Sequence, residues 1–375
     1  MPFSHDFSRL CTVLLMSTRI MTSSVASVYF DSYRSYCAIV EGSTEEVDSY
    51  VVRHLDATAH PLDFTRPLEE IMRSVGFQEL VEMLSPLAGS VRQCVVSTTM
   101  ENALTHQIPY SNTLTTDELR RLVRLEASVH LPAHDAGQFL ATIYPLYGFA
   151  ANPFMAMSVM LSTTITSVAD QISHLLRADL QRLSVAQTAA HDALRYNYPE
   201  ERGIVALLGL QRGFVDVSIV RSSVLLHTMT LCLESELSEV LHEAAEIGYD
   251  EEKQSLERTG LGKLCFDALQ DAEEAVQARI ETAYFFGADL TKAALDEISA
   301  YFADDRATHT EQPTALRRLN PFRRFASRLD ERMNSYCARV GHILTPCIGA
   351  ALPEATAGII LSSHIPSSLT HRKTA

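Results

Sequence analysis

The sequence lacks several features that mark common classes of protein. Lysine and arginine total 31 against 46 aspartate and glutamate residues, so the positive charge needed to bind nucleic-acid phosphates is missing. The 7 cysteines form no Cys-x-x-Cys pair and have no histidine at a metal-ligand spacing, which indicates a reducing compartment and no metal centre. No segment is long and apolar enough for a transmembrane helix. We therefore expect a soluble protein that meets a membrane only through a partner.

What the sequence does contain is enough apolar material for more than one core. With 375 residues, 46% of them hydrophobic, two or three domains are expected at roughly 150 residues each. The apolar run at 10–16 is too short to span a bilayer, so residues 1–23 are interpreted as an unstructured leader, with a start site misplaced upstream of Met16 or Met21 as the alternative. Residues 353–375 are rich in serine, threonine and histidine and are interpreted as a flexible tail.

The first half of the sequence alternates strand and helix signals. Residues 25–41 alternate apolar and polar side chains about a central turn, which predicts a β-hairpin. Residues 65–87 have helical spacing and precede a β-branched strand at 91–100. A further helix is predicted from an N-cap at Thr116 to the break at Pro132. Strands are predicted at 139–147 and from 155, the second leading into a helix.

The second half of the sequence also contains strand signals followed by helix signals. Residues 203–231 give three strands joined by short turns, which predicts an antiparallel meander. Apolar residues at helical spacing predict helix within 235–280, and a strand at 283–287, a helix at 290–303 and a polar linker at 304–313 are predicted after it.

This order of elements resembles the actin, Hsp70 and hexokinase superfamily, in which each half begins with a hairpin or meander. Residues 94–147 are similar to the inserted subdomain of the PilM family of type IV pilus assembly proteins and its relative FtsA, with Glu126, Ala127 and Pro132 in the family's turn. Residues 319–325 (LNPFRRF) and 342–354 (HILTPCIGAALPE) resemble later PilM segments. The resemblance covers most of residues 24–352.

The resemblance implies a bilobed α/β fold of the actin-like ATPase type, which is ribonuclease H-like, with a small PilM/FtsA-type inserted subdomain. The first lobe is expected at 24–200, including the inserted subdomain at about 96–175. The second lobe is expected at 201–352, and its closing helix at about 340–352 is expected to return to the first lobe.

Members of the superfamily hold nucleotide with a carboxylate that positions Mg²⁺ and with glycines that let backbone N–H groups reach phosphate oxygens. The positions that match those loops are Asp31 and Ser32 in the first turn, Gly209, Gln211 and Gly213 in the second, and Gly287 and Ala288 in the adenosine loop. Ser32 replaces a glycine, and the second turn holds no carboxylate. The larger side chains near the turns are expected to fill the cleft: Phe30, Tyr33, Arg34, Tyr36, Gln211 and Arg212.

Loss of the carboxylate that positions Mg²⁺ in the superfamily removes roughly 3–4 kcal/mol of transition-state stabilisation. ATP hydrolysis is therefore not expected. We interpret the chain as a pseudo-ATPase without a bound cofactor. An active, Mg·ATP-binding actin-like protein of the same machinery is the alternative. A third hypothesis, an FtsA-like filament former, requires an amphipathic helix that residues 358–369 do not provide, because Pro366 interrupts them.

The resemblance implies a cytoplasmic scaffold, peripheral to the inner membrane, for a type IV pilus or type II secretion-like assembly. Its partner would be the short cytoplasmic peptide of a PilN-like membrane protein, and homo-oligomers remain open. An extended peptide is expected in a groove between the first lobe and the inserted subdomain, where a strand edge supplies backbone pairing. The residues expected to line this groove are Cys94, Val95, Val96, Leu119, Leu122, Val123 and Glu126.

Overall fold

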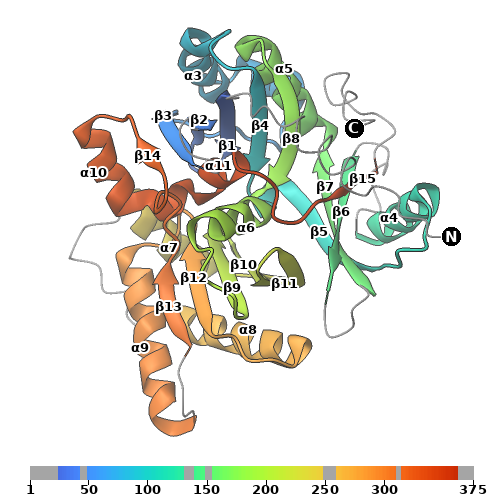
Figure 1. The fold of residues 1–375 in the computed structure, drawn as a ribbon, viewed down its shortest axis with the longest axis vertical. Helices are drawn as coiled ribbons and strands as arrows, with labels where there is room; N and C mark the ends of the chain where they lie inside the picture. Colours follow the sequence, from blue (N-terminus) through green and yellow to red (C-terminus); the bar gives the residue numbers. More distant parts are fainter. Residues whose placement is uncertain are drawn as a thin grey trace, which may run out of the picture.

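The structure, a computed structural model, describes residues 24–42, 49–130, 139–147, 154–247, 259–309 and 314–361. The predicted leader at 1–23 and the last part of the predicted tail, 362–375, lie outside the described residues. Three sheets organise the described chain, and two of them face each other across a central layer that contains α6 (Ala186–Asn197) and α11 (Thr345–Ala350) (Figure 1).

The first-lobe sheet has six strands, and β1 and β4 lie at its centre. In spatial order these strands are β14 (Ala326–Ser327), β3 (Tyr50–Ala57), β2 (Ser35–Gly42), β1 (Ser24–Phe30), β4 (Gln93–Thr98) and β8 (Asp179–Val185). β1 and β2 pair antiparallel with Val28 opposite Cys37, which confirms the predicted hairpin. Residues alternate between the two faces of β1, so Val28 and Phe30 enter an outer core while Tyr29 faces the second lobe.

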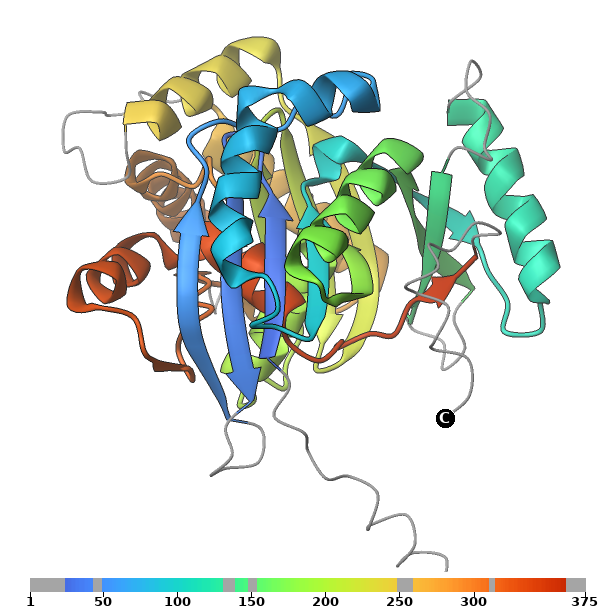
Figure 2. The same cartoon turned by 90° about the horizontal axis from the view of Figure 1, so that it is seen from above.

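Helices cover the outer face of this sheet. They are α2 (Leu68–Arg73), α3 (Val75–Leu84) and α5 (Thr163–Leu176), with the short 3₁₀ turn η1 (Ser85–Leu87) after α3 (Figure 2). The single helix predicted at 65–87 is wrong in one respect. Ser74 is extended and accepts a hydrogen bond from the backbone N–H of Phe77, so the helix ends and restarts there.

The second-lobe sheet has five strands built around the predicted meander, which is confirmed as β9 (Val205–Gln211), β10 (Phe214–Arg221) and β11 (Val224–Cys232). β12 (Thr282–Phe286) and β13 (Ala315–Arg318) add parallel strands on the other side of β9. Its outer face packs against α8 (Leu261–Val276) and α9 (Lys292–His309), and α7 (Ser235–Ile247) precedes α8. α9 continues through residues predicted as a polar linker, so only 310–313 remain outside the described residues there.

The inserted sheet has four strands, in the order β15 (Ile359–Ile360), β6 (Phe139–Leu146), β7 (Met155–Ser162) and β5 (Ala103–Pro109). α4 (Thr116–His130) packs on it through Leu119 and Val123. The hydroxyl of Thr115 accepts from the backbone N–H of Glu118, and the Glu118 carboxylate accepts in return from the backbone N–H of Thr115. The N-cap is therefore Thr115 and not the predicted Thr116.

The inserted subdomain is smaller than the predicted 96–175. β4 ends at Thr98 inside the first-lobe sheet, and the 3₁₀ turn η2 (Met100–Asn102) leads out of it. α5 follows β7 directly, and its residues Val168 and Ile172 lie in the outer core of the first lobe. Apolar periodicity in the sequence could not show whether α5 belongs to the first lobe or to the inserted subdomain, because an amphipathic helix packs equally well against either sheet.

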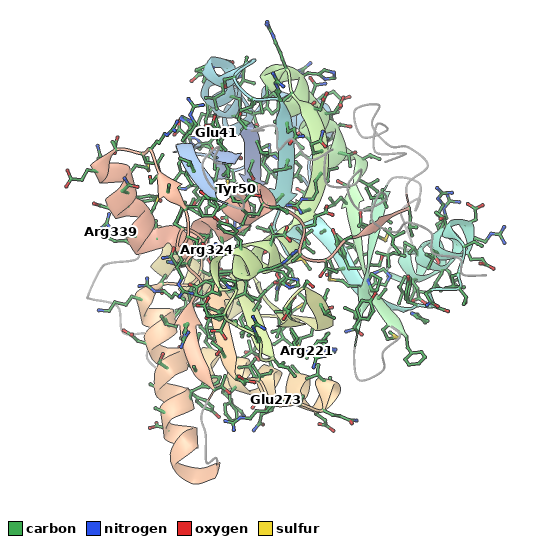
Figure 3. The ribbon with its side chains drawn as sticks, in the orientation of Figure 1. Glu41, Tyr50, Arg221, Glu273, Arg324 and Arg339 are labelled. Atoms are coloured by element: carbon green, nitrogen blue, oxygen red, sulfur yellow. The ribbon has the colours of Figure 1, made fainter. Side chains whose placement is uncertain are left out.

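The chain returns to the first lobe earlier than predicted. β14 pairs with β3 after only a short connection from β13, and α10 (Glu331–Val340) and the 3₁₀ turn η4 (Gly341–Leu344) follow. Tyr50 of β3 packs edge-on against Tyr196, and the guanidinium of Arg324 lies 5.1 Å from the centre of the Tyr196 ring (Tyr50 and Arg324 are labelled in Figure 3). α11 then packs on α6 and on β1 and β4, as expected for a closing helix.

Candidate functional site: the cleft between the lobes

The first turn of the cleft connects β1 and β2 and is organised by Asp31. The backbone N–H of Asp31 donates to Arg34 O at 3.0 Å, which closes the turn. The Asp31 carboxylate accepts from the Tyr29 hydroxyl and from the backbone N–H of Tyr33, both at 3.1 Å. Only 4% of Asp31 is exposed, and this burial raises its pKa to about 6. The hydrogen bonds of its carboxylate are thus made with residues of the first lobe.

Tyr33 carries the contact from the first turn to the second lobe. Its hydroxyl donates to Oδ1 of Asp289, which lies in the loop after β12. The same hydroxyl lies 3.0 Å from Nδ1 of His242 on α7, and the two rings stack with centroids 5.1 Å apart. The side chain therefore joins both lobes.

The second turn, between β9 and β10, makes another contact across the cleft. Gln211 is 2% exposed, and its Oε1 accepts from the backbone N–H of Met100 in η2 at 3.0 Å. Gly213 has φ +78, so the turn itself requires its glycine. Gly209 has a different role, because an added Cβ would lie 2.7 Å from the ring of Phe286.

The third loop follows β12 and contains the remaining predicted nucleotide positions. Gly287 has φ +109, and an added Cβ would lie 2.1 Å from Leu210 O. The backbone N–H of Asp289 also donates to Leu210 O, at 3.3 Å. The glycine is thus explained by close packing of the loop on the end of β9. Ala288 is partly exposed beside it.

Three carboxylates that the sequence reasoning missed also face this cleft. Asp216 on β10 is buried, and its pKa is raised to about 7 because its carboxylate is removed from water. Burial raises the pKa of Asp289 to about 7 as well, and the nearby charges of Asp31 and Glu101 add to that rise. Glu101 accepts a hydrogen bond from Ser32 at 2.7 Å.

Acidic side chains therefore gather in this cleft, and the charges of Arg34 and Arg212 partly counter the rise in the pKa values of Asp31 and Asp289. The sequence signal for Asp216 was a carboxylate within a mostly apolar strand.

The predicted filling of the cleft is correct for Tyr33 and Gln211 and wrong for Phe30. The Phe30 ring lies in the outer core against Phe64, with ring centroids 5.1 Å apart, because residue alternation in β1 turns it away from the cleft. Arg34 and Tyr36 line a pocket of about 410 Å³ between β3 and α10. Arg212 is exposed.

The predicted peptide-binding strand is wrong. β4 pairs with β1 on one side and β8 on the other, so neither edge of β4 can accept a peptide. Cys94, Val95 and Val96 are at most 6% exposed and belong to hydrophobic cores. On α4, Leu119 and Val123 are buried against the inserted sheet, whereas Leu122 and Glu126 are partly exposed.

Two further properties concern the described part of the chain. Within it, no group of three or more histidine, cysteine, aspartate or glutamate side chains could hold a metal ion. The helices of that part include none with both the length and the apolar character needed to cross a membrane.

Comparison with solved structures identifies the fold. The chain is similar to a structure described as the PilM-PilN type IV pilus biogenesis complex, with TM-score 0.60 and 14% identity over 87% of this chain and 97% of that one. The chain has the actin-like ATPase fold. The described chain contains the two facing lobes and the small inserted sheet expected from the sequence.

Two other solved structures are more distantly similar to the chain. A Bacteroides thetaiotaomicron protein with an actin-like ATPase fold matches at TM-score 0.41 and 8% identity, over 86% of this chain and 98% of that one. The cytoplasmic domain of EpsL, a component of the Vibrio cholerae type II secretion system, matches at TM-score 0.36 and 14% identity, over 62% of this chain and 79% of that one. No protein-family model and no curated protein matches the sequence.

Proposed function

We propose that the protein is a non-catalytic PilM-like scaffold on the cytoplasmic side of an inner membrane, where it belongs to a type IV pilus or type II secretion-like assembly. Its proposed partner is the cytoplasmic peptide of a PilN-like membrane protein. The fold shared with the PilM-PilN complex supports the choice of partner. The protein reaches the membrane through that partner.

The observation that carries the non-catalytic part of the proposal is the bridge from Tyr33 to Asp289 and His242. In an actin-like ATPase, bound nucleotide holds the two lobes together. Here Tyr33 makes that connection through Asp289 and His242, and several acidic side chains lie around it. A ligand that binds the closed and the open form with equal affinity cannot shift the equilibrium between them.

A second candidate function is an active Mg·ATP-binding protein. Both hairpins retain a buried carboxylate at the cleft, Asp31 on the first and Asp216 on the second. Carboxylates are the side chains that hold Mg²⁺ through water in phosphate sites. Rearrangement of Tyr33 would be required to admit the phosphates.

Thermal unfolding with millimolar Mg·ATP separates the two functions. A protein that binds at 100 times its Kd gains about 2.7 kcal/mol, which raises the unfolding temperature measurably. The scaffold proposal expects no rise for the wild type. A clear rise in the wild type that disappears in Asp31→Asn would support the ATP-binding candidate instead.

The partner is tested with a synthetic peptide that matches the cytoplasmic tail of a PilN-like protein encoded beside this gene. We expect saturable binding, with an affinity that changes less than about threefold, or roughly 0.7 kcal/mol, when Mg·ATP is added. A scrambled peptide of the same composition is the control. Equal binding of both peptides would contradict the proposed partner.

A further inference from the structure

The segment that follows α11 crosses from the lobes to the inserted sheet. Residues 353–361 leave the central layer, pass along α6 and end as β15 beside β6, a path visible in both views (Figures 1 and 2). The interpretation of this segment as part of a flexible tail is therefore wrong for residues 359–360, which form a strand.

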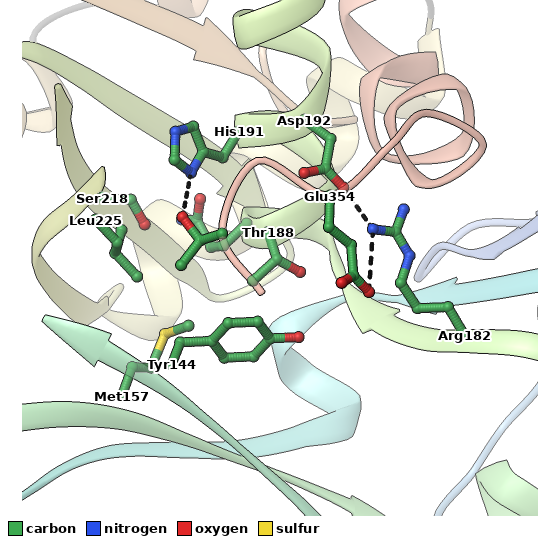
Figure 4. Close-up of a pocket in the computed structure, with 11 residues that line it drawn as sticks. Tyr144, Met157, Arg182, Thr188, His191, Asp192, Ser218, Leu225 and Glu354 are labelled. Atoms are coloured by element: carbon green, nitrogen blue, oxygen red, sulfur yellow. Dashed lines mark hydrogen bonds and ion pairs between the residues drawn. The ribbon is translucent and has the colours of Figure 1, made fainter. Parts of the chain in front are cut away.

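The near end of the segment is held by a buried ionic cluster. Arg182 on β8 lies 2.8 Å from Asp192 of α6 and 3.6 Å from Glu354 (Figure 4). Asp192 in turn accepts from the backbone N–H of Ala355 at 2.6 Å, and Arg195 donates to Glu354 O at 3.0 Å. Several charge-assisted hydrogen bonds therefore fix residues 354–355 at the junction of the lobes.

The far end is held by a strand edge and by the buried Leu361 side chain, with Ile359 packed against the same core. Ile359 and Ile360 lie opposite Ile143 and Thr142 of β6 in antiparallel register. The backbone N–H of Leu361 donates to Ala141 O at 2.8 Å. The Leu361 side chain is 3% exposed and lies in the core formed by α4 and the inserted sheet.

Arg120 of α4 completes the far contact, because its Nε donates to Leu361 O at 2.6 Å. This end has the parts of a peptide site. It has a strand edge that, among the described strands, β15 alone occupies, a pocket for the Leu361 side chain and a cation that binds the Leu361 carbonyl. Such sites take extended peptides, with backbone pairing for affinity and the pocket for selectivity.

The pairing is short, and its strength differs along the segment. β15 has two residues, and Ile360 between the two ends is 41% exposed. The fixed residues 354–355 keep the strand close to β6, so its local concentration is high even when it detaches. Detachment would free the β6 edge without disturbing the buried ionic cluster.

We propose that residues 359–361 fill, within the same chain, an edge site for an extended peptide from a partner, and that the partner binds by displacing this strand. The incoming peptide would place an aliphatic side chain in the Leu361 pocket and its carbonyl on Arg120. Only the identity of that partner, the PilN-like peptide, rests on the proposed function.

The first test uses the full chain and a labelled peptide, PEATAGIIL, that copies residues 353–361. In Leu361→Asp the internal strand cannot enter its pocket, so the added peptide should bind at least about tenfold more tightly than to the wild type. Ile360→Ser, which changes the exposed neighbour, should bind the peptide as the wild type does. Equal binding to wild type and Leu361→Asp, or no binding to either, overturns the proposal.

A second test does not depend on the fold of the Leu361 variant. Thr142 and Ile360 lie opposite each other, so Thr142→Cys with Ile360→Cys can join the strand to β6 by a disulfide, in a background of Cys11→Ser and Cys232→Ser. Oxidation should abolish binding of the PEATAGIIL peptide, and reduction should restore it. Unchanged binding after complete oxidation overturns the proposal.

The same variants distinguish this inference from the proposed function. If PEATAGIIL responds as expected while the PilN-like peptide binds no variant, the edge site stands and the proposed partner is wrong. If the PilN-like peptide binds the oxidised and reduced forms equally, it binds elsewhere, and the displacement proposal is wrong.

Discussion

The hydroxyl of Tyr33 in the first lobe donates a hydrogen bond to the carboxylate of Asp289 in the second lobe, with His242 stacked on the tyrosine ring. Asp289 is buried, and Oδ2 of its carboxylate has no hydrogen-bond partner among the described residues. The Tyr33 contact is therefore the side-chain hydrogen bond that stabilises this buried acid, and it joins the first turn to the loop after β12.

Tyr33→Phe should lower the free energy of unfolding by about 1–3 kcal/mol, because it leaves a buried acid without its hydroxyl donor. Urea denaturation followed by circular dichroism measures this change. Tyr147→Phe, at a tyrosine that is 36% exposed on the inserted subdomain, is the matched control and should stay within about 0.5 kcal/mol of the wild type. Equal effects of the two substitutions would show that the bridge does not stabilise the lobes.

Stability should fall as pH rises through the range in which Asp216 ionises. Burial raises its folded pKa to about 7 from an ordinary value of 3.8. A carboxyl with a raised pKa contributes stability that is complete below the unfolded pKa and is lost as pH rises through the folded pKa. At about 1.4 kcal/mol per pKa unit, the loss for this group is at most about 4 kcal/mol between pH 4 and 7.

Asp216→Asn removes that ionisation while keeping the shape of the side chain. The variant should lose less stability than the wild type between pH 4 and 7, as measured by urea denaturation at several pH values. A residual slope should remain, because the pKa values of Asp31 and Asp289 are also raised. Asp271→Asn, at an exposed position on α8, should follow the wild type. Parallel curves for wild type and Asp216→Asn would contradict the prediction.

Gly287→Ala should be strongly destabilising, by more than about 3 kcal/mol, because it combines a positive φ of +109 with a Cβ only 2.1 Å from Leu210 O. Gly89→Ala is the control, since it has φ +76 but nothing within 4 Å of the added Cβ. Its cost should be about 1 kcal/mol. Similar losses for the two variants in urea denaturation would show that the close approach to Leu210 is not what requires Gly287.

The sequence determined the local elements and the type of fold. Alternation at 25–41 and 203–231 predicted the hairpin and the meander, because residues of period two place one face of a strand in a core. The order of those elements, with the PilM-like motifs, was sufficient for the actin-like fold. The replacement of the first-turn glycine by Ser32 was also visible in the sequence alone.

Tertiary structure alone decided which strand edges are free and which polar residues meet in the cleft. Cys94–Val96 were predicted to form a peptide-binding edge, because the residues of a strand do not show which strands lie beside it. In the structure, β1 and β8 occupy the two sides of β4. Tyr33 and Asp289 are distant in sequence, and only packing of the lobes brings them together, as it brings Asp216 near Tyr29. The strand at 359–360 has only two residues, too few for a periodic signal, and its order comes from the β6 edge and the Leu361 pocket that receive it.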